Sequence, residues 1–562
     1  MFKITWILSP MDSSYSLREA RELTKEEAGD QIMVHFIDSY KMDTDLEEYQ
    51  RSYEYLENAD FIGILIHGGL TQFNSFEEIM NQYGGKKKFF IYSGFEDENR
   101  AMLKHSKIFP EEYSEIVKYI RGGSTNNCIN LYKYLSSKYG DKKHSYDPPE
   151  ALSWEGIYYP KKDFNTCVTE IAHKRKAGTP IIGVLFYSKY AHERNTEHID
   201  ALITEVEKRG AYPFVIYTAS APEPCVGCKG FKWVMDNLLM INGNCQVDAI
   251  INVLGYSQSI MASAGDGRKM IQNSIFEALD IPVMQGVVTY QTYEDWKTNL
   301  RGVDGMSFTS SIYYPEFDGQ ITTTTFAYSE YVKDHIGNRT VHKPILSQVS
   351  QICRLAINWA KLRIVDNKDK KVAILFHNMP PRNDMIGCAF GLDTPQSVYL
   401  MVEALKKAGV KTEYSFEGGD EIIQRIINAV TIDTRWLSAD QAIERSVDTI
   451  AGEEYRDWFS KLDNKVQEEL IRDWGNPPGE YMVHNDTLPL PGIINGNIFI
   501  GLQPPRGYEE KAEEVYHNTD IVPPHQYISY YKWIRNAFKA DVIFHVGTHG
   551  TLEWLPGKEI GL

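Results

Sequence analysis

Short apolar runs recur along this chain between amphipathic segments, and this alternation limits the fold more than any other feature of the sequence. The first four runs are Ile4 to Leu8, Ile32 to Phe36, Phe61 to Ile66 and Lys88 to Tyr92. Their lengths suit buried strands, and the segments between them, such as Leu17 to Ala28, have helical character. Strands that alternate with helices pair in parallel and place the helices on the faces of the sheet. The sequence therefore predicts an α/β protein whose several domains contain mainly parallel sheets flanked by helices.

Polar segments divide the chain of 562 residues into three predicted domains. A chain of this length is expected to form three or four domains at roughly 150 residues each. The first covers residues 1–145, the second residues 146–345 and the third residues 346–562. Within the third domain, residues 420–474 are polar and predict a helical insertion. No helix, cap or polar tail follows the last predicted strand, so we expect the third domain to be incomplete at its C-terminus.

Charge and cysteine content exclude several classes of protein. The chain has 59 basic and 76 acidic residues and a net charge of −17. Nucleic acid is not an expected partner, because phosphate binding requires a basic surface. The sequence contains no run of about 18 apolar residues, so no membrane span is expected. The N-terminus lacks the apolar core of a secretory signal, and seven cysteines, an odd number, do not suggest a disulfide framework. These features predict a cytoplasmic protein.

Two histidines and a glutamate follow the last predicted strand. Val542 to Phe544 leads into a glycine-rich turn that carries His545, His549 and Glu553. The spacing of four residues between His549 and Glu553 would bring the two side chains together if the turn is helical, as an acid–base pair or as two metal ligands. For His545 alone, a hydrogen-bonded core histidine is the competing interpretation. The pattern differs from His-Glu-x-x-His, which is typical of zinc proteases.

Two further loops rich in proline lie beside predicted strands of the third domain. They are residues 378–383, which include Asn383, and residues 502–508, which include Gln503 and Arg506. In a doubly wound sheet, loops after parallel strands gather at one edge and line one crevice. These loops and the terminal turn therefore predict a single pocket. The competing interpretation is that the prolines only end the strands.

A Cys-x-x-Cys pair and a glycine-rich segment give weaker signals. Cys225 and Cys228 lie in a proline-rich loop, with Cys245 further along. A metal or redox role is one interpretation, but a structural zinc site requires four ligands and no second pair follows at the usual spacing. The segment Gly265 to Lys269 lacks the spacing of a phosphate-binding loop, so this chain is not expected to hydrolyse ATP itself.

The stretch from His545 to Lys558 resembles a signature of the large subunits of tetrapyrrole metal chelatases, His-x-Gly-Thr-His-Gly-x-Leu-Glu-x-x-Pro-Gly-Lys. That family contains a cobaltochelatase (CobN) branch and a magnesium chelatase H branch. The resemblance extends from about residue 180 onward and includes Gly183 to Tyr187, Pro315 to Gly319, Gly496-Asn497, Gln503-Pro504 and Pro524-His525. Members of the family continue well beyond this signature, so the chain is expected to be truncated relative to the family and to represent its N-terminal part.

Two segments, Gly391 to Pro395 and Gln503 to Gly507, resemble the cobalt branch. The resemblance implies the tetrapyrrole-binding subunit, or its N-terminal part, of an ATP-dependent cobaltochelatase that inserts cobalt into a corrin precursor in cobalamin biosynthesis. Such an enzyme is a ligase that forms nitrogen–metal bonds. Cobalt would be the substrate metal, a corrin or porphyrin-type tetrapyrrole the ligand, and AAA+ ATPase partner subunits would hydrolyse ATP. The alternatives are the large subunit of a magnesium or other metal chelatase, and a non-catalytic tetrapyrrole-binding protein.

Metal insertion requires groups that strip water from the metal and accept the pyrrole N–H protons. Under the resemblance, the catalytic candidates are Glu553, His549 and His545, and Glu553 and His549 are also the candidate metal ligands. Arg506 suits a bidentate grip on ring carboxylates or amides. The other candidate substrate-binding residues are Gln503, His525, Glu316, Asp393 and Asn383.

Overall fold

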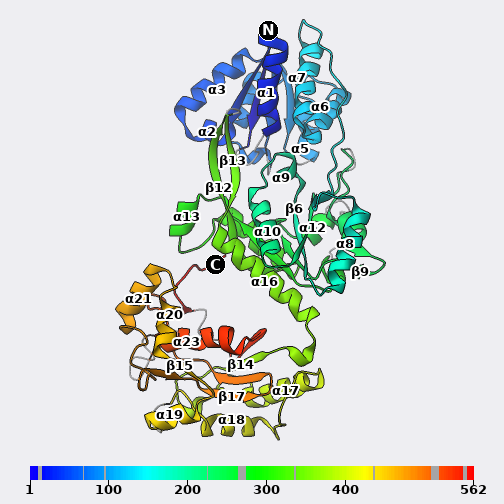
Figure 1. Cartoon of the computed structure of the whole chain (residues 1–562). Helices are drawn as coiled ribbons and strands as arrows, with labels where there is room; N and C mark the ends of the chain where they lie inside the picture. Colours follow the sequence, from blue (N-terminus) through cyan, green and yellow to red (C-terminus); the bar gives the residue numbers. More distant parts are fainter. Residues whose placement is uncertain are drawn as a thin grey trace. The chain divides into compact units, whose positions relative to one another are not determined.

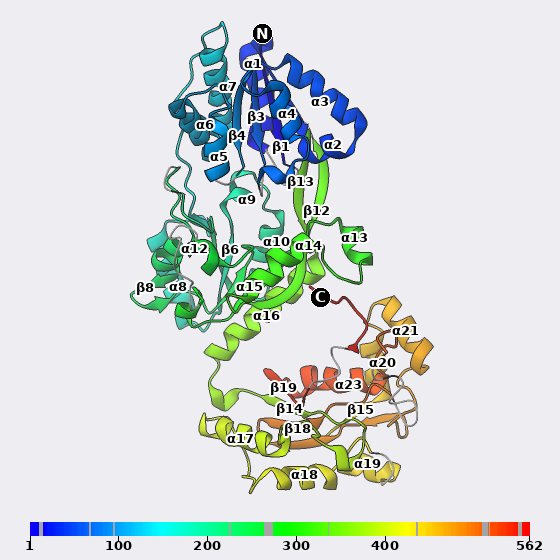
Figure 2. The same cartoon turned by 180° about the vertical axis from the view of Figure 1, so that it is seen from behind.

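The computed structural model of the chain forms two compact units (Figures 1 and 2). It describes residues 1–9, 15–66, 69–93, 96–223, 226–263, 274–334, 337–433, 437–507, 515, 518–548 and 554–561. The first unit is Met1–Ala360 with Lys558–Leu562, and the second is Lys361–Gly557. The predicted division into three domains stays a prediction. None of the helices in the described segments combines the length and the apolarity that crossing a bilayer requires.

The first sheet, in the first unit, has four parallel strands in the order β2-β1-β3-β4. They are β1 (Phe2–Leu8), β2 (Ile32–Asp38), β3 (Phe61–Leu65) and β4 (Lys88–Tyr92), which confirms the four predicted strands. The helices around it are α1 (Tyr15–Ala28), α2 (Ser39–Thr44), α3 (Leu46–Asn58), α4 (Phe76–Tyr83), α5 (Glu96–Leu103), α6 (Pro110–Gly122) and α7 (Thr125–Tyr139). Ile4 packs in one core with Leu131, and Ile7 packs in the other with Ile79, so helices cover both faces.

The second sheet has seven strands in the order β13-β12-β11-β10-β6-β7-β5. The five inner strands are parallel and the two edge strands are antiparallel. The strands are β5 (Gly156–Tyr159), β6 (Ile181–Tyr187), β7 (Tyr212–Thr218), β10 (Ala249–Asn252), β11 (Val283–Val288), β12 (Ile321–Asp334) and β13 (Gly337–Pro344). A small hairpin joins β8 (Met240–Ile241) to β9 (Asn244–Cys245).

Helices of this region follow or connect the strands of the second sheet. They are α8 (Phe164–Lys176), α9 (Ser188–His192), α10 (Glu197–Lys208), α11 (Phe231–Val234), α12 (Gln258–Ser263), α13 (Tyr293–Thr298), α14 (Gly305–Phe308), α15 (Tyr314–Glu316) and α16 (Leu346–Ile364). Val184 on β6 packs with α10 and α16 on one face, and Leu185 packs with α8 and α11 on the other. The alternation of successive residues between the two faces explains the continuous apolar strand Ile181–Tyr187.

The third sheet lies in the second unit and has the order β17-β18-β14-β19. The strands are β14 (Val372–Phe376), β17 (Gly492–Asn495), β18 (Ile498–Leu502) and β19 (Val542–Val546), and a small hairpin pairs β15 (Thr449–Ala451) with β16 (Thr487–Pro489). Strand β14 pairs in parallel with β18 and with β19, whereas β17 is antiparallel to β18. Gly496, at φ 64°, and Asn497 form the two-residue turn between β17 and β18, where a left-handed residue favours glycine.

Helices cover both faces of the third sheet. Helices α17 (Thr394–Lys407) and α18 (Gly419–Asn428) pack on one face, and α20 (Gly452–Phe459), α21 (Asn464–Trp474) and α23 (His525–Trp533) pack on the other (Figures 1 and 2). Helix α19 (Ala439–Arg445) lies between α18 and β15 in the chain. Helices α18 to α21 lie largely within residues 420–474, and the predicted insertion with these bounds stays a prediction. The α/β class with mainly parallel sheets flanked by helices is confirmed.

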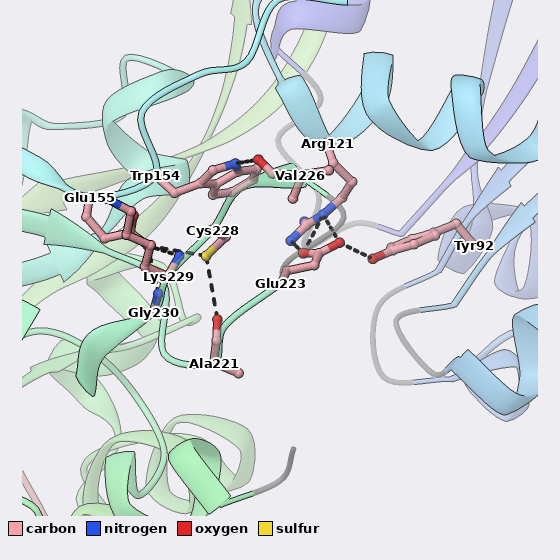
Figure 3. Close-up of polar contacts among 10 residues, drawn as sticks. All are labelled: Tyr92, Arg121, Trp154, Glu155, Ala221, Glu223, Val226, Cys228, Lys229 and Gly230. Atoms are coloured by element: carbon pink, nitrogen blue, oxygen red, sulfur yellow. Dashed lines mark hydrogen bonds and ion pairs between the residues drawn. The ribbon is translucent and has the colours of Figure 1, made fainter. Parts of the chain in front are cut away.

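A charged contact ties the first sheet region to the second within the first unit. Arg121 on α6 forms an ion pair with Glu223, and its Nε lies 3.0 Å from Glu223 Oε2 (Figure 3). Tyr92 at the end of β4 donates its hydroxyl to the same carboxylate at 3.4 Å. The guanidinium also lies 4.9 Å from the ring centroid of Trp154. The ion pair with Glu223 and the contact with the Trp154 ring both involve Arg121, which is partly buried. These contacts hold α6 against the segment that follows β7.

Two buried histidines pack together in the first unit. His198 on α10 is fully buried, His342 on β13 is 6% exposed, and their ring centroids lie 5.3 Å apart. Burial lowers the pKa of His342 to about 4, and the nearby Lys189 acts in the same direction. Burial also lowers the pKa of His198 well below its ordinary value. Both imidazoles therefore stay neutral in the folded protein at a pH where histidines of the unfolded chain bind protons.

We expect the first unit to lose stability as the pH falls from about 6.5 toward about 4, because only the unfolded chain binds protons at these histidines in that range. For His342 the loss is about 1.4 kcal/mol per pH unit. His342→Gln should flatten this dependence of the free energy of unfolding, measured by urea titration at a series of pH values. His105→Gln, at an exposed position, is the control and should keep the wild-type slope. An unchanged slope in H342Q would contradict the assignment.

Candidate functional site

Three strands of the third sheet end together, and their loops form the candidate site. Phe376, the last residue of β14, pairs with Leu502 of β18 on one side and with Val546 of β19 on the other. Gln503 N donates to Phe376 O at 2.9 Å, and His377 N donates to Val546 O at 3.0 Å. The loops that follow these strands therefore leave from one edge. This confirms that the two proline-rich loops and the terminal turn start at a common edge.

A chain of hydrogen bonds crosses this edge and holds His545. Gln503 Nε2 donates to Tyr531 Oη at 3.0 Å, and Tyr531 Oη lies 2.7 Å from His545 Nε2. Tyr531 Oη accepts from the amide and shares a hydrogen bond with His545 Nε2, in which the donor depends on the histidine tautomer. The pKa of Tyr531 is raised far above its ordinary value, chiefly by burial, so the hydroxyl stays protonated. This hydrogen bond ties the ring of His545 to α23.

The surroundings of His545 favour the neutral form of its imidazole ring. Partial desolvation of the ring lowers the pKa of His545, although the side chain as a whole remains exposed at the end of β19. Its ring centroid lies 5.8 Å from that of Tyr531. The competing interpretation of His545 as a core histidine does not fit this exposure. His545 lies on the surface of the edge, with one ring nitrogen engaged by a hydroxyl.

The loop after β14 contacts the terminal turn. Phe390 N donates to Thr548 Oγ1 at 2.9 Å. The side chain of Phe390 is 98% exposed, and Leu392 is 44% exposed. This loop therefore presents apolar groups to solvent next to the start of the signature segment.

His549 and Glu553, the predicted catalytic pair and metal ligands, lie outside the described residues. Their predicted roles stay predictions. The described residues on either side are Thr548, which is exposed, and Trp554, which is partly buried.

Arg506 and His525 are buried in the second unit. Arg506 is 1% exposed, and its Nη2 donates to Asn518 O at 2.8 Å and to Ile521 O at 2.7 Å. His525 is 2% exposed; its Nε2 donates to Gly475 O at 2.9 Å and its Nδ1 accepts from Tyr455 Oη, also at 2.9 Å. Burial lowers the pKa of His525, which matches a neutral ring with both nitrogens engaged. Both side chains are directed to groups of the protein, so their predicted contacts with a substrate stay predictions that this geometry does not support.

The three remaining candidate residues occupy different settings. Asp393 caps α17, where its carboxylate accepts from Gln396 N at 3.0 Å. Asn383 N donates to Asp433 Oδ2 at 3.2 Å, and Asn383 Oδ1 is buried without a hydrogen-bond partner among the described residues. Glu316 belongs to the first unit, where it is exposed on α15 and accepts from Thr322 Oγ1 at 3.4 Å. Their predicted contacts with a substrate stay predictions.

Two residues of this edge, His377 and Tyr531, were not predicted from the sequence. His377 is the first residue after β14, just as Gln503 is the first residue after β18. This shared position could have identified His377 as a candidate. Tyr531 lies within α23 among other aromatic residues, where a tyrosine is usually part of the core. No local pattern of the sequence distinguishes Tyr531 from its neighbours.

Cys228, in the first unit, lies in a buried setting. Its Sγ is 3.4 Å from Glu155 Oε1 and 3.6 Å from Ala221 O (Figure 3). The same carboxylate oxygen accepts from Lys229 N at 2.9 Å and Gly230 N at 2.8 Å. Burial and the Glu155 charge raise the pKa of Cys228 to about 12. Cys225 lies outside the described residues, and the described part of the chain contains no group of three potential metal ligands.

Several known proteins are similar to this chain. A model described as CobN/Magnesium Chelatase matches residues 117–562. An uncharacterized protein of Methanocaldococcus jannaschii is 33% identical over 97% of this chain and 45% of its own length. The aerobic cobaltochelatase subunit CobN of Pseudomonas aeruginosa is 27% identical over 91% of this chain and 39% of its own length. The magnesium-chelatase subunit ChlH of Oryza sativa is 27% identical over 82% of this chain and 33% of its own length.

A solved structure shares the fold. The catalytic subunit of cobaltochelatase from Mycobacterium tuberculosis matches with a TM-score of 0.66 and 24% identity, over 100% of this chain and 44% of that chain. The chain thus spans less than half the length of each of these proteins. The similarity also begins earlier than the sequence predicted, at residue 117 for the family model rather than at about residue 180.

The buried, protonated state of Cys228 can be tested by alkylation, because the thiolate is the reactive form. In the folded protein at pH 7.5, we expect iodoacetamide to modify exposed Cys388 at least about tenfold faster than Cys228, as measured by mass spectrometry of digested samples. In urea the two cysteines should react at similar rates. Equal rates in the folded protein would contradict the structural role of Cys228.

Proposed function

Because the chain belongs to the CobN/magnesium chelatase family, we propose that it is the tetrapyrrole-binding subunit of a metal chelatase, or the N-terminal part of that subunit. The observation that carries this proposal is the continuity of the signature segment with β19. The signature begins at His545, at the edge where β14, β18 and β19 end together. A planar ligand seated at this edge would meet all three loops.

The chemistry of metal insertion assigns different roles to the residues of the signature. A tetrapyrrole must lose its pyrrole N–H protons, and the metal must exchange its waters for the ring nitrogens. A carboxylate or imidazole near the ring centre performs both tasks, as a proton acceptor and as a transient ligand. Glu553 and His549 supply these groups. His545 Nε2 is already engaged in a hydrogen bond with Tyr531 Oη, so we assign it to positioning the start of the loop.

Cobalt is the proposed substrate metal and a corrin precursor of cobalamin the proposed tetrapyrrole. The segments Gly391 to Pro395 and Gln503 to Gly507 favour the cobalt branch. Magnesium is the alternative metal, because the CobN and ChlH relatives are equally similar at 27% identity. ATP would be hydrolysed by AAA+ partner subunits, since the sequence contains no phosphate-binding loop. We also propose a cytoplasmic location, because an odd number of cysteines in a chain of this size does not suggest a disulfide framework.

Binding of a tetrapyrrole is the first test. Titration of the chain with a corrin precursor and with protoporphyrin should quench tryptophan fluorescence in a saturable way, with the corrin binding more tightly. Free tryptophan at the same absorbance is the control for light absorbed by the ligand. If neither ligand gives saturable quenching, the proposal fails.

Glu553→Gln tests the proton acceptor. The amide has the same size but cannot accept a pyrrole proton, so we expect tetrapyrrole binding within about twofold of wild type and metal insertion slower by roughly 10² or more. Insertion is measured by absorbance in the presence of the ATPase partners. His549→Ala should have a smaller effect if Glu553 alone is the base, and an equal effect if the two act as a unit. Wild-type insertion by E553Q would rule out Glu553 as the base.

A further inference from the structure

A hollow on the surface of the second unit lies along one face of α23. Its lining includes Tyr527, Ile528, Tyr531, Lys532, Arg535 and Leu555. The first four residues belong to α23, and Arg535 belongs to the π-helical turn Ile534–Phe538 that continues it. Positions four residues apart lie on the same helix face, which explains why these side chains share one wall.

The aromatic part of this wall is shared with the candidate site. The ring centroids of Tyr527 and Tyr531 lie 5.0 Å apart, and Tyr531 also binds His545 Nε2 at 2.7 Å. Leu555 comes from the signature segment, two residues after Glu553 in the sequence. The hollow and the edge of the sheet therefore meet at Tyr531. A flat apolar ligand in the hollow would lie next to the start of the signature segment.

Among the described residues that line the hollow, the two charged ones, Lys532 and Arg535, are both cations. Among the residues that the structure describes, Lys532 Nζ has one long contact of 3.5 Å, to Trp458 O, and Arg535 forms no hydrogen bond or ion pair. Burial, Arg535 and Lys461 each lower the pKa of Lys532. The nearby carboxylate of Asp457 is paired with Lys461 at 2.6 Å.

Lys532 and Arg535 lie in the last turns of α23 and of its π-helical continuation, where the carbonyl end of a helix favours positive charge. The two like charges nevertheless repel each other, and the partial desolvation of Lys532 adds to this cost. The chain has 76 acidic and 59 basic residues, so carboxylates for pairing are plentiful elsewhere. An anionic ligand would neutralise the cations and recover the energy that their desolvation costs.

Resting on the function proposed above, we propose that the α23 hollow binds the carboxylate side chains of the tetrapyrrole. Lys532 and Arg535 contact the carboxylates, and Tyr527 and Tyr531 contact the apolar edge of the ring. The hollow thereby selects macrocycles with free carboxylates over those in which the carboxylates are esterified or amidated. It also orients the ring toward the edge of the sheet.

In the dimethyl ester of protoporphyrin, the two carboxylates of the acid are methylated and carry no charge. The two ligands therefore test this selection directly. Wild type should bind the acid at least about tenfold more tightly than the ester, as measured by fluorescence quenching. The double variant Lys532→Gln/Arg535→Gln should lose at least about tenfold in affinity for the acid and stay within about twofold for the ester. Higher salt should weaken binding of the acid by wild type more than by the variant.

A matched control separates local from general charge effects. Lys407→Gln/Lys465→Gln removes the same charge at exposed positions outside the hollow and should bind both ligands like wild type. Arg535→Gln alone, at an exposed position, should show part of the selective loss even if the double variant is less stable. If wild type binds acid and ester equally, or if the double variant weakens both equally, the hollow does not select carboxylates. Binding of neither ligand by wild type would instead contradict the proposed function itself.

Discussion

The parallel pairing of β14 with both β18 and β19 determines the geometry on which the candidate site depends. Its register sets Phe376 between Leu502 and Val546, and segments far apart in the sequence thereby start their loops at the same edge. Backbone hydrogen bonds then continue past the strands, from Gln503 N to Phe376 O and from His377 N to Val546 O. If this register shifted by one residue, the side chains of Gln503 and His545 would each move to the other face of the sheet.

Much of this edge could be predicted from the sequence, because the end of a strand is a local signal. The apolar run Val542 to Phe544 predicted β19, and residues in the proline-rich loops beside the strands, such as Gln503 and Asn383, followed from their position alone. The hydrogen bond between Tyr531 and His545 could not be predicted in this way. It depends on the rotation of α23 about its axis and on its packing against the sheet, which are set by tertiary contacts.

Arg506 and His525 show that residue type alone does not distinguish a binding role from a structural one. An arginine in a proline-rich loop looks equally suited to a ligand and to the protein's own carbonyl groups. In the structure Arg506 donates to Asn518 O and Ile521 O, so it links the segment just after β18 to residues 518 and 521. His525 joins Gly475 O to Tyr455 Oη in the same way. Both residues therefore shape the surroundings of the site from within the protein, and burial is the property that distinguishes this role.

Separation of charge links the edge of the sheet to the α23 hollow. A carboxylate that serves as a proton acceptor loses basicity when a cation pairs with it, because the ion pair lowers its pKa. An acidic tetrapyrrole nevertheless needs cations to hold it. The structure meets both needs by placing Lys532 and Arg535 in the hollow, while the polar groups that hold His545 at the edge, the Gln503 amide and the Tyr531 hydroxyl, are neutral. Tyr531 belongs to both surfaces and adds no charge to either. A ring anchored by its carboxylates in the hollow would then reach the signature segment without bringing the anchoring cations to the base.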